Sequence, residues 1–395
     1  MKIKKIAAVL ICALLITAAP AGCGQEMVWP LPEEESPSQA PDPLPTEQTG
    51  AAEPAGDQQE SDQGNGIDFD AAYAAFPPGT AMINAGGYTV TWAELYFNIH
   101  SNINAILQNF GAIQDWSEII YSGMTFAETV LDYAAENALM YKAVEYGADL
   151  NGVTLGPDAY DSMREDYESS AGQYGGEEEF MRVLWEMDGI SSRELFDYLV
   201  STSYLASAVF TELYGANGEL LSDEDAAEYT AGDGYLMAKH ILRLRDEDDD
   251  GAALADIEDI LEQLDNYDGD DFEAFFDGLM YEYSDDGGLS MFPNGYLFQY
   301  GDMMPEFYDA CVALDIGGYS GVVETSYGYH IVYRIPINYD EIPSYLYSQY
   351  NFTTLRSVAA QGIFDSAMYG WMNALDPEYT AAYNSIDFDV IFSLS

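Results

Sequence analysis

A change of pattern near Gly232 constrains the fold of this chain more than any other feature. Before that point, apolar residues recur at helical spacing behind several helix-start signals, whereas beyond it strand-like and helix-like stretches are mixed. The later order is strand, helix, helix, loop, helix, strand, strand, which predicts a small antiparallel sheet surrounded by helices. We therefore expect an α+β protein, in which such a domain is inserted into an all-helical domain.

Helix-start signals divide the region before this change. Thr91-x-x-Glu94 and Thr125-x-x-Glu128 have the spacing of capping boxes, in which side chain and backbone at a helix start satisfy each other's hydrogen bonds. Residues 82–90 precede the first box and predict a short hairpin around two glycines. The two capped helices are expected to end near Phe110 and Tyr146, and further helices to start at Pro157, at Ser191-x-x-Glu194 and at Ser222.

The remaining elements are predicted from periodicity and from turn residues. They are a strand at 235–244, helices at 252–265 and 272–279, a loop at 284–302, a helix from Pro305, two strands between 320 and 337, a long helix at 344–374 and a short strand at 386–392. Because no glycine- or proline-rich linker precedes it, the long helix is expected to pack on the helical domain.

The first 68 residues have the composition of an export leader followed by a tether. A basic start, MKIKK, precedes an apolar run at 6–19 that is too short to span a bilayer comfortably. Small residues then precede Cys23 as at a lipoprotein cleavage site, so we expect removal of 1–22 and a lipid on Cys23; plain secretion is the alternative. Residues 23–68, rich in Pro, Glu, Gln and Ser, predict a disordered tether.

The charge is strongly acidic, with 69 Asp and Glu against 12 Lys and Arg and a net charge of −57. Such a surface repels nucleic acid and anionic lipid and attracts basic polypeptides and cations. We therefore expect no nucleic-acid partner. Solubility of an exported protein is the simplest interpretation of the charge, binding of clients with basic segments is the second, and a cation-buffering surface protein is the weakest.

The small numbers of cysteines and histidines limit which disulfides and metal sites the chain can form. Cys12 lies in the leader and Cys23 would be lipidated, which leaves Cys311 alone and predicts no disulfide within the mature chain. Three scattered histidines argue against a zinc site. We therefore expect no metal and no cofactor.

Two of the three histidines fall in predicted strands, His240 in the first and His330 in the stretch TSYGYHIVY at 325–333. Alternation along a strand places His330 on one face with Val332, and His240 on one face with Ala238 and Leu242. Alternation alone does not bring the two imidazoles together, because the register between the strands is not in the pattern.

Residues 238–335 resemble the parvulin-type peptidyl-prolyl isomerases. The matching motifs are AKHIL at 238–242, YSDDG at 283–287, GDMMPEF at 301–307 and TSYGYHI at 325–331, in the order and spacing of that family. With the leader, the tether and the flanking helices, the whole chain resembles the PrsA-type foldase lipoproteins, which are related in layout to SurA-type chaperones. The resemblance divides the chain into a leader at 1–22, a tether at 23–68, a helical chaperone-like domain at 69–232, a parvulin domain at 233–338 and a C-terminal segment at 339–395.

The resemblance also implies roles for the residues that match. His240 and His330 fall on the histidine pair, Thr325 on a threonine hydrogen-bonded to it, Asp286 on a Cys or Asp facing the substrate, Leu297, Met303 and Phe307 on the apolar cup for the proline ring, and Tyr327 near the site. The loop at 294–298 reads NGYLF where the family has GGDLG, so the width of the groove is open.

These residue types suit the reaction that the resemblance implies. Prolyl isomerisation breaks no bond, and its barrier is the roughly 20 kcal/mol needed to twist the imide out of plane. A catalyst must favour the twisted state over both planar states. An apolar cup can grip the ring, a histidine pair can orient the polar wall, and Asp286 could place a negative potential near the carbonyl.

Two functions follow as alternatives. In the first, the chain is an extracytoplasmic, membrane-anchored isomerase that also holds unfolded exported polypeptides. In the second, it is a catalytically weak parvulin-like module that binds peptides without accelerating their isomerisation.

Overall fold

The computed structural model describes residues 66–121, 123–245, 250–349 and 351–393. The predicted leader, Cys23, nearly all of the predicted tether and residues 246–249 of the acidic run lie outside these ranges. The described chain forms two compact units. The first joins Leu139–Phe180 to Arg193–Asp376, and the second joins the described residues up to Ala138 to Met181–Ser192 and to the chain from Pro377.

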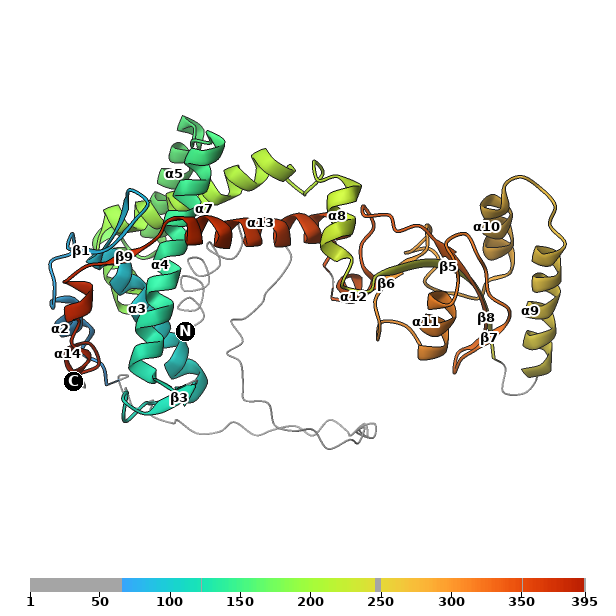
Figure 1. The fold of residues 1–395 in the computed structure, drawn as a ribbon, viewed down its shortest axis with the longest axis horizontal. Coiled ribbons are helices and arrows are strands. Elements are labelled where there is room, and N and C mark those ends of the chain that lie inside the picture. Colours follow the sequence, from blue (N-terminus) through green and yellow to red (C-terminus); the bar gives the residue numbers. More distant parts are fainter. Residues whose placement is uncertain (1–65, 122, 246–249, 350, 394–395) are drawn as a thin grey trace. The chain divides into compact units, whose positions relative to one another are not determined.

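The second unit is built around a three-stranded antiparallel sheet (Figure 1). β1 (Ala81–Ala85) and β2 (Tyr88–Thr91) form the predicted hairpin, and β9 (Glu378–Tyr379) pairs with β1. α3 (Trp92–Phe110) begins at the predicted capping box, in which the Thr91 hydroxyl accepts from the Glu94 N–H and the Glu94 carboxylate accepts from the Thr91 N–H. The unit also contains α2 (Phe69–Tyr73), β3 (Ile119–Tyr121), β4 (Met124–Thr125), a 3-10 turn η1 (Tyr383–Ser385), α14 (Phe388–Ile391), the first half of α4 (Phe126–Asn151) and most of α6 (Glu177–Asp188).

The strand predicted at 386–392 is wrong, because this stretch contains the short helix α14. Asp387 caps the helix, and its carboxylate accepts the N–H of Asp389 at 2.9 Å. Periodicity over so few residues does not distinguish a strand from one helical turn, whereas the capping carboxylate favours the turn.

The helices of the first unit include α5 (Pro157–Gln173), α7 (Arg193–Tyr214), α8 (Asp223–Thr230) and α13 (Leu355–Ala374). α5 begins at Pro157 and α8 is capped by Ser222, both as predicted, whereas α4 continues beyond the predicted end and α6 was not predicted. α13 packs against α7 and α8 through Ala359, Ala360 and Phe364, which meet Phe210 and Ala226.

The single long helix predicted at 344–374 is two helices, α12 (Ser344–Ser348) and α13. Side chains start the second helix anew: the Thr354 hydroxyl accepts the N–H of Ser357 at 3.2 Å, and the Asn351 side chain accepts the N–H of Thr353 at 3.0 Å. Polar side chains that bond to nearby backbone groups compete with helix continuation, which explains the break.

A four-stranded antiparallel sheet forms the predicted α+β region, in the order β6-β5-β8-β7. The strands are β5 (Leu236–Leu244), β6 (Tyr296–Phe298), β7 (Val323–Glu324) and β8 (Gly328–Ile335). β6 lies inside the predicted loop at 284–302, which is therefore corrected. β5 and β8 pair along nearly their whole length, with His240 opposite Val332 and His330 opposite Leu242.

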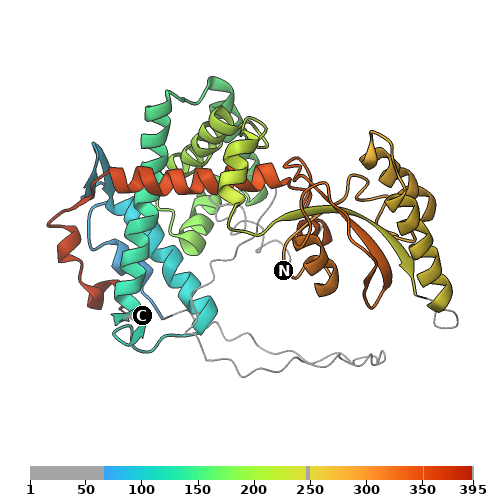
Figure 2. The ribbon, with the colours of Figure 1, turned by 45° about the vertical axis from the view of Figure 1, so that its right-hand side comes forward.

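Helices cover both faces of this sheet (Figures 1 and 2). α9 (Asp250–Asp265) and α10 (Phe272–Tyr283) pack on one face against a cluster that includes Met237, Ile241 and Ile331. α11 (Pro305–Val312) packs on the other face against Ala238, Phe298 and Val332, through Phe307 and Cys311. The alternation predicted along β5 and β8 is confirmed, because the residues grouped with each histidine share the α11 face.

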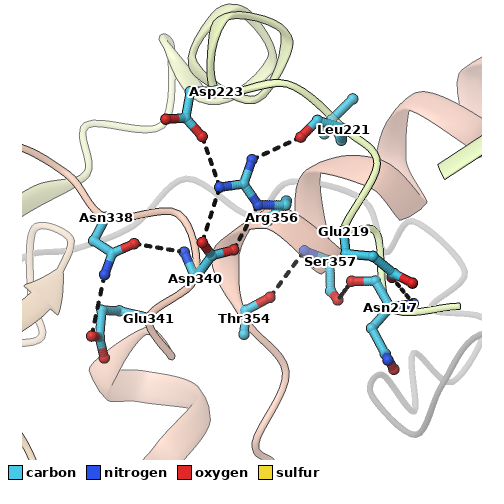
Figure 3. A network of polar contacts seen from close by, with 10 residues as sticks. All are labelled: Asn217, Glu219, Leu221, Asp223, Asn338, Asp340, Glu341, Thr354, Arg356 and Ser357. Atoms are coloured by element: carbon cyan, nitrogen blue, oxygen red, sulfur yellow. Dashed lines mark hydrogen bonds and ion pairs between the residues drawn. The ribbon is translucent and has the colours of Figure 1, made fainter. Parts of the chain in front are cut away.

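The segment that follows β8 is tied to the helices around it by Arg356 (Figure 3). The Arg356 guanidinium donates to the carboxylate of Asp340, to the carboxylate of Asp223 and to the carbonyl of Leu221. The Arg356 side chain is 12% exposed, so its charge is largely removed from water and depends on these partners. One side chain thus joins α13, α8 and residues 338–341.

Candidate active site

A cavity of about 670 Å³ opens on the α11 face of the four-stranded sheet. Its floor is formed by His240 from β5 and His330 from β8, and Phe307 from α11 lies beside them. The other lining residues are Leu242, Asp286, Tyr296, Tyr300, Gly301, Asp302, Met303, Met304, Pro305, Tyr308 and Tyr327. Aromatic rings and thioethers therefore make much of the lining, together with the two imidazoles and the carboxylates of Asp286 and Asp302.

The two histidines, which sequence alone could not bring together, are in contact. Their Nδ1 atoms lie 3.1 Å apart and their rings are nearly parallel, with centroids 5.3 Å apart and 14° between planes. The diagonal register, in which each histidine lies opposite an apolar residue of the other strand, produces this stacking. Phe307 packs edge-on against both rings and keeps them in place.

Each histidine has a further partner on its outer nitrogen. His330 Nε2 lies 2.8 Å from the Thr325 hydroxyl, and His240 Nε2 lies 3.1 Å from the Asp286 carboxylate. Thr325, His330, His240 and Asp286 thus form a continuous line of hydrogen bonds, which we name the histidine relay. All four predicted polar site residues belong to it.

The chemistry of its ends gives the relay a direction when both imidazoles are neutral. An ionised carboxylate only accepts, so His240 Nε2 must carry a proton and donate it to Asp286. The bare His240 Nδ1 then accepts from His330 Nδ1–H, and the bare His330 Nε2 accepts from the Thr325 hydroxyl. The N–H of Tyr327 donates to the same hydroxyl oxygen at 3.1 Å, so Thr325 is held from the other side.

Burial and hydrogen bonding set the charge states of His330 and Asp286. Desolvation, aided by repulsion from His240, lowers the pKa of His330 to about 4, so this imidazole is neutral at physiological pH. Burial alone would raise the pKa of Asp286, but hydrogen bonds from His240, Tyr296 and the Gly288 N–H outweigh it and lower the pKa to about 2. The relay therefore joins a neutral imidazole to a fixed anion.

The predicted apolar cup is present only in part. Met303 and Phe307 line the cavity, and Tyr327 lies at its rim with a 61% exposed side chain. Leu297 does not line the cavity, and its assignment to the cup is corrected: it pairs with Met237 and packs in the cluster under α9 and α10. Because side chains alternate along β6, Tyr296 faces the cavity in its place.

Tyr296 is the site residue that sequence reasoning missed. Its hydroxyl donates to the Asp286 carboxylate at 2.7 Å, and its ring lies edge-on to His240. Recognition of β6 as a strand would have identified it, since alternation places Tyr296 and Phe298 on one face. Met304, Tyr300 and Tyr308 were also not predicted.

Other features bear on cofactors and membranes. Within the described ranges, no cluster of three or more His, Cys, Asp or Glu is placed to hold a metal ion. Cys311 is buried and unpaired on α11. No helix in the same ranges is long and apolar enough to cross a membrane.

Comparison with known proteins identifies the class. Residues 240–335 match the family model described as "Rotamase: PPIC-type PPIASE domain". This part of the chain is therefore a parvulin-type domain of PPIC class, in agreement with the resemblance drawn from its motifs.

Over longer stretches, the chain is similar to proteins named PrsA. It is 27% identical over 213 residues to Foldase protein PrsA of Halalkalibacterium halodurans, a match covering 52% of this chain and 57% of that protein. Among solved structures it is similar to the peptidylprolyl isomerase PrsA of Bacillus anthracis, at 20% identity, with 58% and 93% of the two chains covered and a TM-score of 0.22. PrsA of Bacillus subtilis gives 22% identity, coverage of 66% and 92%, and a TM-score of 0.24.

Proposed function

We propose that this chain is an extracytoplasmic peptidyl-prolyl cis–trans isomerase that also holds unfolded polypeptides. The observation that carries the proposal is the histidine relay at the floor of an aromatic and thioether-lined cavity. The match of residues 240–335 to a PPIC-type domain supports the same activity.

The cavity can stabilise a twisted imide without forming a bond to it. Met303 and Phe307 would hold the pyrrolidine ring, since a flexible thioether and a flat ring adapt to an apolar group. The polar floor would face the carbonyl that rotates. Because the barrier of roughly 20 kcal/mol arises from imide resonance, fixing the ring while the carbonyl turns favours the twisted state over both planar states.

Asp286 would act mainly on the relay. One of its oxygens accepts from Tyr296 and faces His240, and the other accepts the N–H of Gly288 at 2.9 Å. A carboxylate with these partners keeps a proton on His240 Nε2 and so fixes the tautomers along the relay. A direct effect of its charge on the substrate carbonyl is the weaker contribution, because the donors around it spread that charge.

We infer that clients carry basic segments. The basic side chains of the parvulin region are engaged within the protein: Lys239 with Glu273 and Asp277, Arg243 with Asp256 and Asp285, Arg245 with Glu324, and Arg334 with the Leu314 carbonyl. Against a net charge of −57, a basic peptide is attracted and an acidic one repelled. Binding should weaken as salt rises from low ionic strength; equal binding of matched acidic and basic proline peptides would contradict this.

The anchor belongs to the same proposal. A lipid on Cys23 and a tether at 23–68 would hold the folded units near the outer face of the membrane, where exported chains emerge. Expression with a labelled fatty acid tests it: the label should enter the native chain and be absent from Cys23→Ser. Equal labelling of both chains would remove the anchor and leave plain secretion.

A second function, a catalytically weak module that holds peptides, is favoured by one observation. Tyr296 and Tyr300 add bulk to the cavity wall near the loop whose sequence departs from the family pattern. Such a cavity would bind proline peptides while restricting rotation of the carbonyl.

The deciding experiment measures cis–trans exchange of a proline peptide by NMR, using the full chain and its His240→Ala variant. The isomerase predicts acceleration by the native chain that falls at least tenfold in the variant, with peptide binding retained. Native exchange at the uncatalysed rate, together with measurable binding, would leave only the holding function.

A further inference from the structure

We propose that Tyr296 is a positioning residue of the site: its hydroxyl fixes the Asp286 carboxylate, and through it the proton arrangement of the histidine relay. This inference rests on the proposed isomerase for its kinetic consequence. Its structural part, the control of the His240 tautomer, stands independently of catalysis.

The first argument is the geometry around the carboxylate. Tyr296 donates to the same Asp286 oxygen that faces His240, at 2.7 Å against 3.1 Å. A carboxylate can turn about its terminal bond, and the Gly288 N–H holds only the other oxygen. The tyrosine hydroxyl bonds the shared oxygen itself, and with the Gly288 N–H it fixes the plane of the carboxylate so that this oxygen is directed at the imidazole.

The ring of Tyr296 is itself held in place on both sides. It packs edge-on against His240, with centroids 5.4 Å apart, and against Phe292, with centroids 4.5 Å apart. Phe292 in turn packs against Tyr347 of α12. A hydroxyl on a ring fixed in this way loses little freedom when it bonds, which favours a positioning role.

The chain leaves space for this hydroxyl at one glycine. A Cβ on Gly288 would overlap the hydroxyl oxygen of Tyr296, although the backbone there is not left-handed and would accept alanine. The absence of a side chain at Gly288 thus lets the Tyr296 hydroxyl reach the Asp286 carboxylate. Burial and the neighbouring carboxylate raise the pKa of Tyr296, so the phenol keeps its proton and remains a donor over the physiological range.

Three variants of the full chain test the proposal. Tyr296→Phe removes the hydroxyl and keeps the ring, while Gly288→Ala keeps the tyrosine and displaces its hydroxyl. Tyr319→Phe is the matched control, since the Tyr319 hydroxyl also donates to a carboxylate, that of Asp265 at 2.8 Å, and Tyr319 does not line the cavity.

The first readout is the tautomer of His240, measured by long-range ¹H–¹⁵N correlation after labelling the three histidines with ¹⁵N. The native chain and Tyr319→Phe should show one tautomer, protonated at Nε2. Tyr296→Phe and Gly288→Ala should show a mixture. An unchanged single tautomer in both site variants would overturn the proposal, even if the chain proved to have no isomerase activity.

The second readout is kinetic. In Tyr296→Phe, kcat should fall about tenfold with KM within about twofold, because the wall of the cavity is kept and the relay is not. Gly288→Ala should reproduce this fall, yet add little in the Tyr296→Phe background, where the displaced atom is absent. Full additivity of the two changes, or an equal fall in Tyr319→Phe, would contradict a positioning role.

Discussion

The three histidines occupy two kinds of buried site, and comparing them shows which features accompany a functional site and which accompany burial alone. His100, in the second unit, is fully buried on α3 against Phe69 and Gly189. Its Nδ1 meets the Asn104 side chain, while its Nε2 has no hydrogen-bond partner within the described chain. In His240 and His330, by contrast, every ring nitrogen has a partner and both rings face a cavity.

Perturbed titration does not distinguish the two sites. Burial lowers the pKa of His100 to about 4, and burial with repulsion from His240 lowers that of His330 to a similar value. A shifted pKa indicates a buried group, whereas a cavity with convergent, fully partnered polar groups indicates a site. Substitutions at the two kinds of site test whether this distinction holds.

The largest expected effect is on catalysis. His330→Phe should lower kcat/KM for a proline peptide by about 10²-fold, because it removes the central link of the relay. His100→Phe, an equally buried change outside the cavity, should leave kcat/KM within about twofold. The measurement is cis–trans exchange by NMR, and equal losses in both variants would show that burial alone explains the site.

The next effect compares two positions on α11. Phe307→Ala removes a buried ring that packs on both relay histidines and should reduce the free energy of unfolding by about 3 kcal/mol or more. It should also weaken binding of proline peptides. Val312→Ala, at a 51% exposed position of the same helix, should change stability by about 0.5 kcal/mol or less.

Chemical denaturation with peptide titration measures both quantities. If Val312→Ala weakened peptide binding as much as Phe307→Ala, the cavity would not be the binding site.

The dependence of stability on pH should be shared by the two histidine sites. Between about pH 6.5 and about pH 4, the unfolded chain binds protons at His100 and His330 and the folded chain does not. Stability should therefore fall as pH falls through this window, by about 3 kcal/mol for each histidine. Asp286 adds a further loss below about pH 3.8, since its folded pKa is depressed.

The test compares the native chain with His100→Phe and with His330→Phe by denaturation at pH 7 and pH 4.5. Each variant should lose less stability than the native chain across this interval, and by similar amounts. A smaller loss in only one of the variants would break the equivalence of the two buried sites.

An element of the fold can be predicted from the sequence when contacts between neighbouring residues determine it, and not when contacts with distant parts of the chain do. Helix caps are local, so the start of α3 followed from the capping box at Thr91 and the start of α8 from the N-cap Ser222. The three-residue strand β6 exists because it pairs with β5, far away in sequence, so the local pattern at 284–302 predicts only a loop and does not show that Leu297 faces away from the cavity. The break before α13 depended on polar side chains that a helical period does not include.

The same difference between local and distant contacts applies to the residues of the site. Motifs identified His240, Asp286, Thr325 and His330, but their hydrogen bonds depend on the register of β5 with β8 and could not be derived from the pattern. Tyr296 could not be assigned to the site from sequence, because the loop NGYLF at 294–298 that contains it departs from the family motif. The residues that adjust a site from a neighbouring strand are visible only once the strand order is known.

The smallest expected effect on catalysis is at Arg356, a largely buried side chain whose hydrogen bonds are satisfied but which lies outside the cavity. Arg356 is as well partnered as the relay, with two carboxylates and a carbonyl around its guanidinium, but it lines no cavity described in the first unit (Figure 3). Arg356→Met keeps the aliphatic stem and should cost about 1–3 kcal/mol of stability, because the carbonyl of Leu221 and the carboxylates lose their donor. The rate of prolyl isomerisation should stay within about twofold of the native rate. If the rate fell as far as in His330→Phe while the fold was retained, then the link from α13 to the segment after β8 would be part of the catalytic apparatus, and the distinction drawn between cavity and scaffold would have to be abandoned.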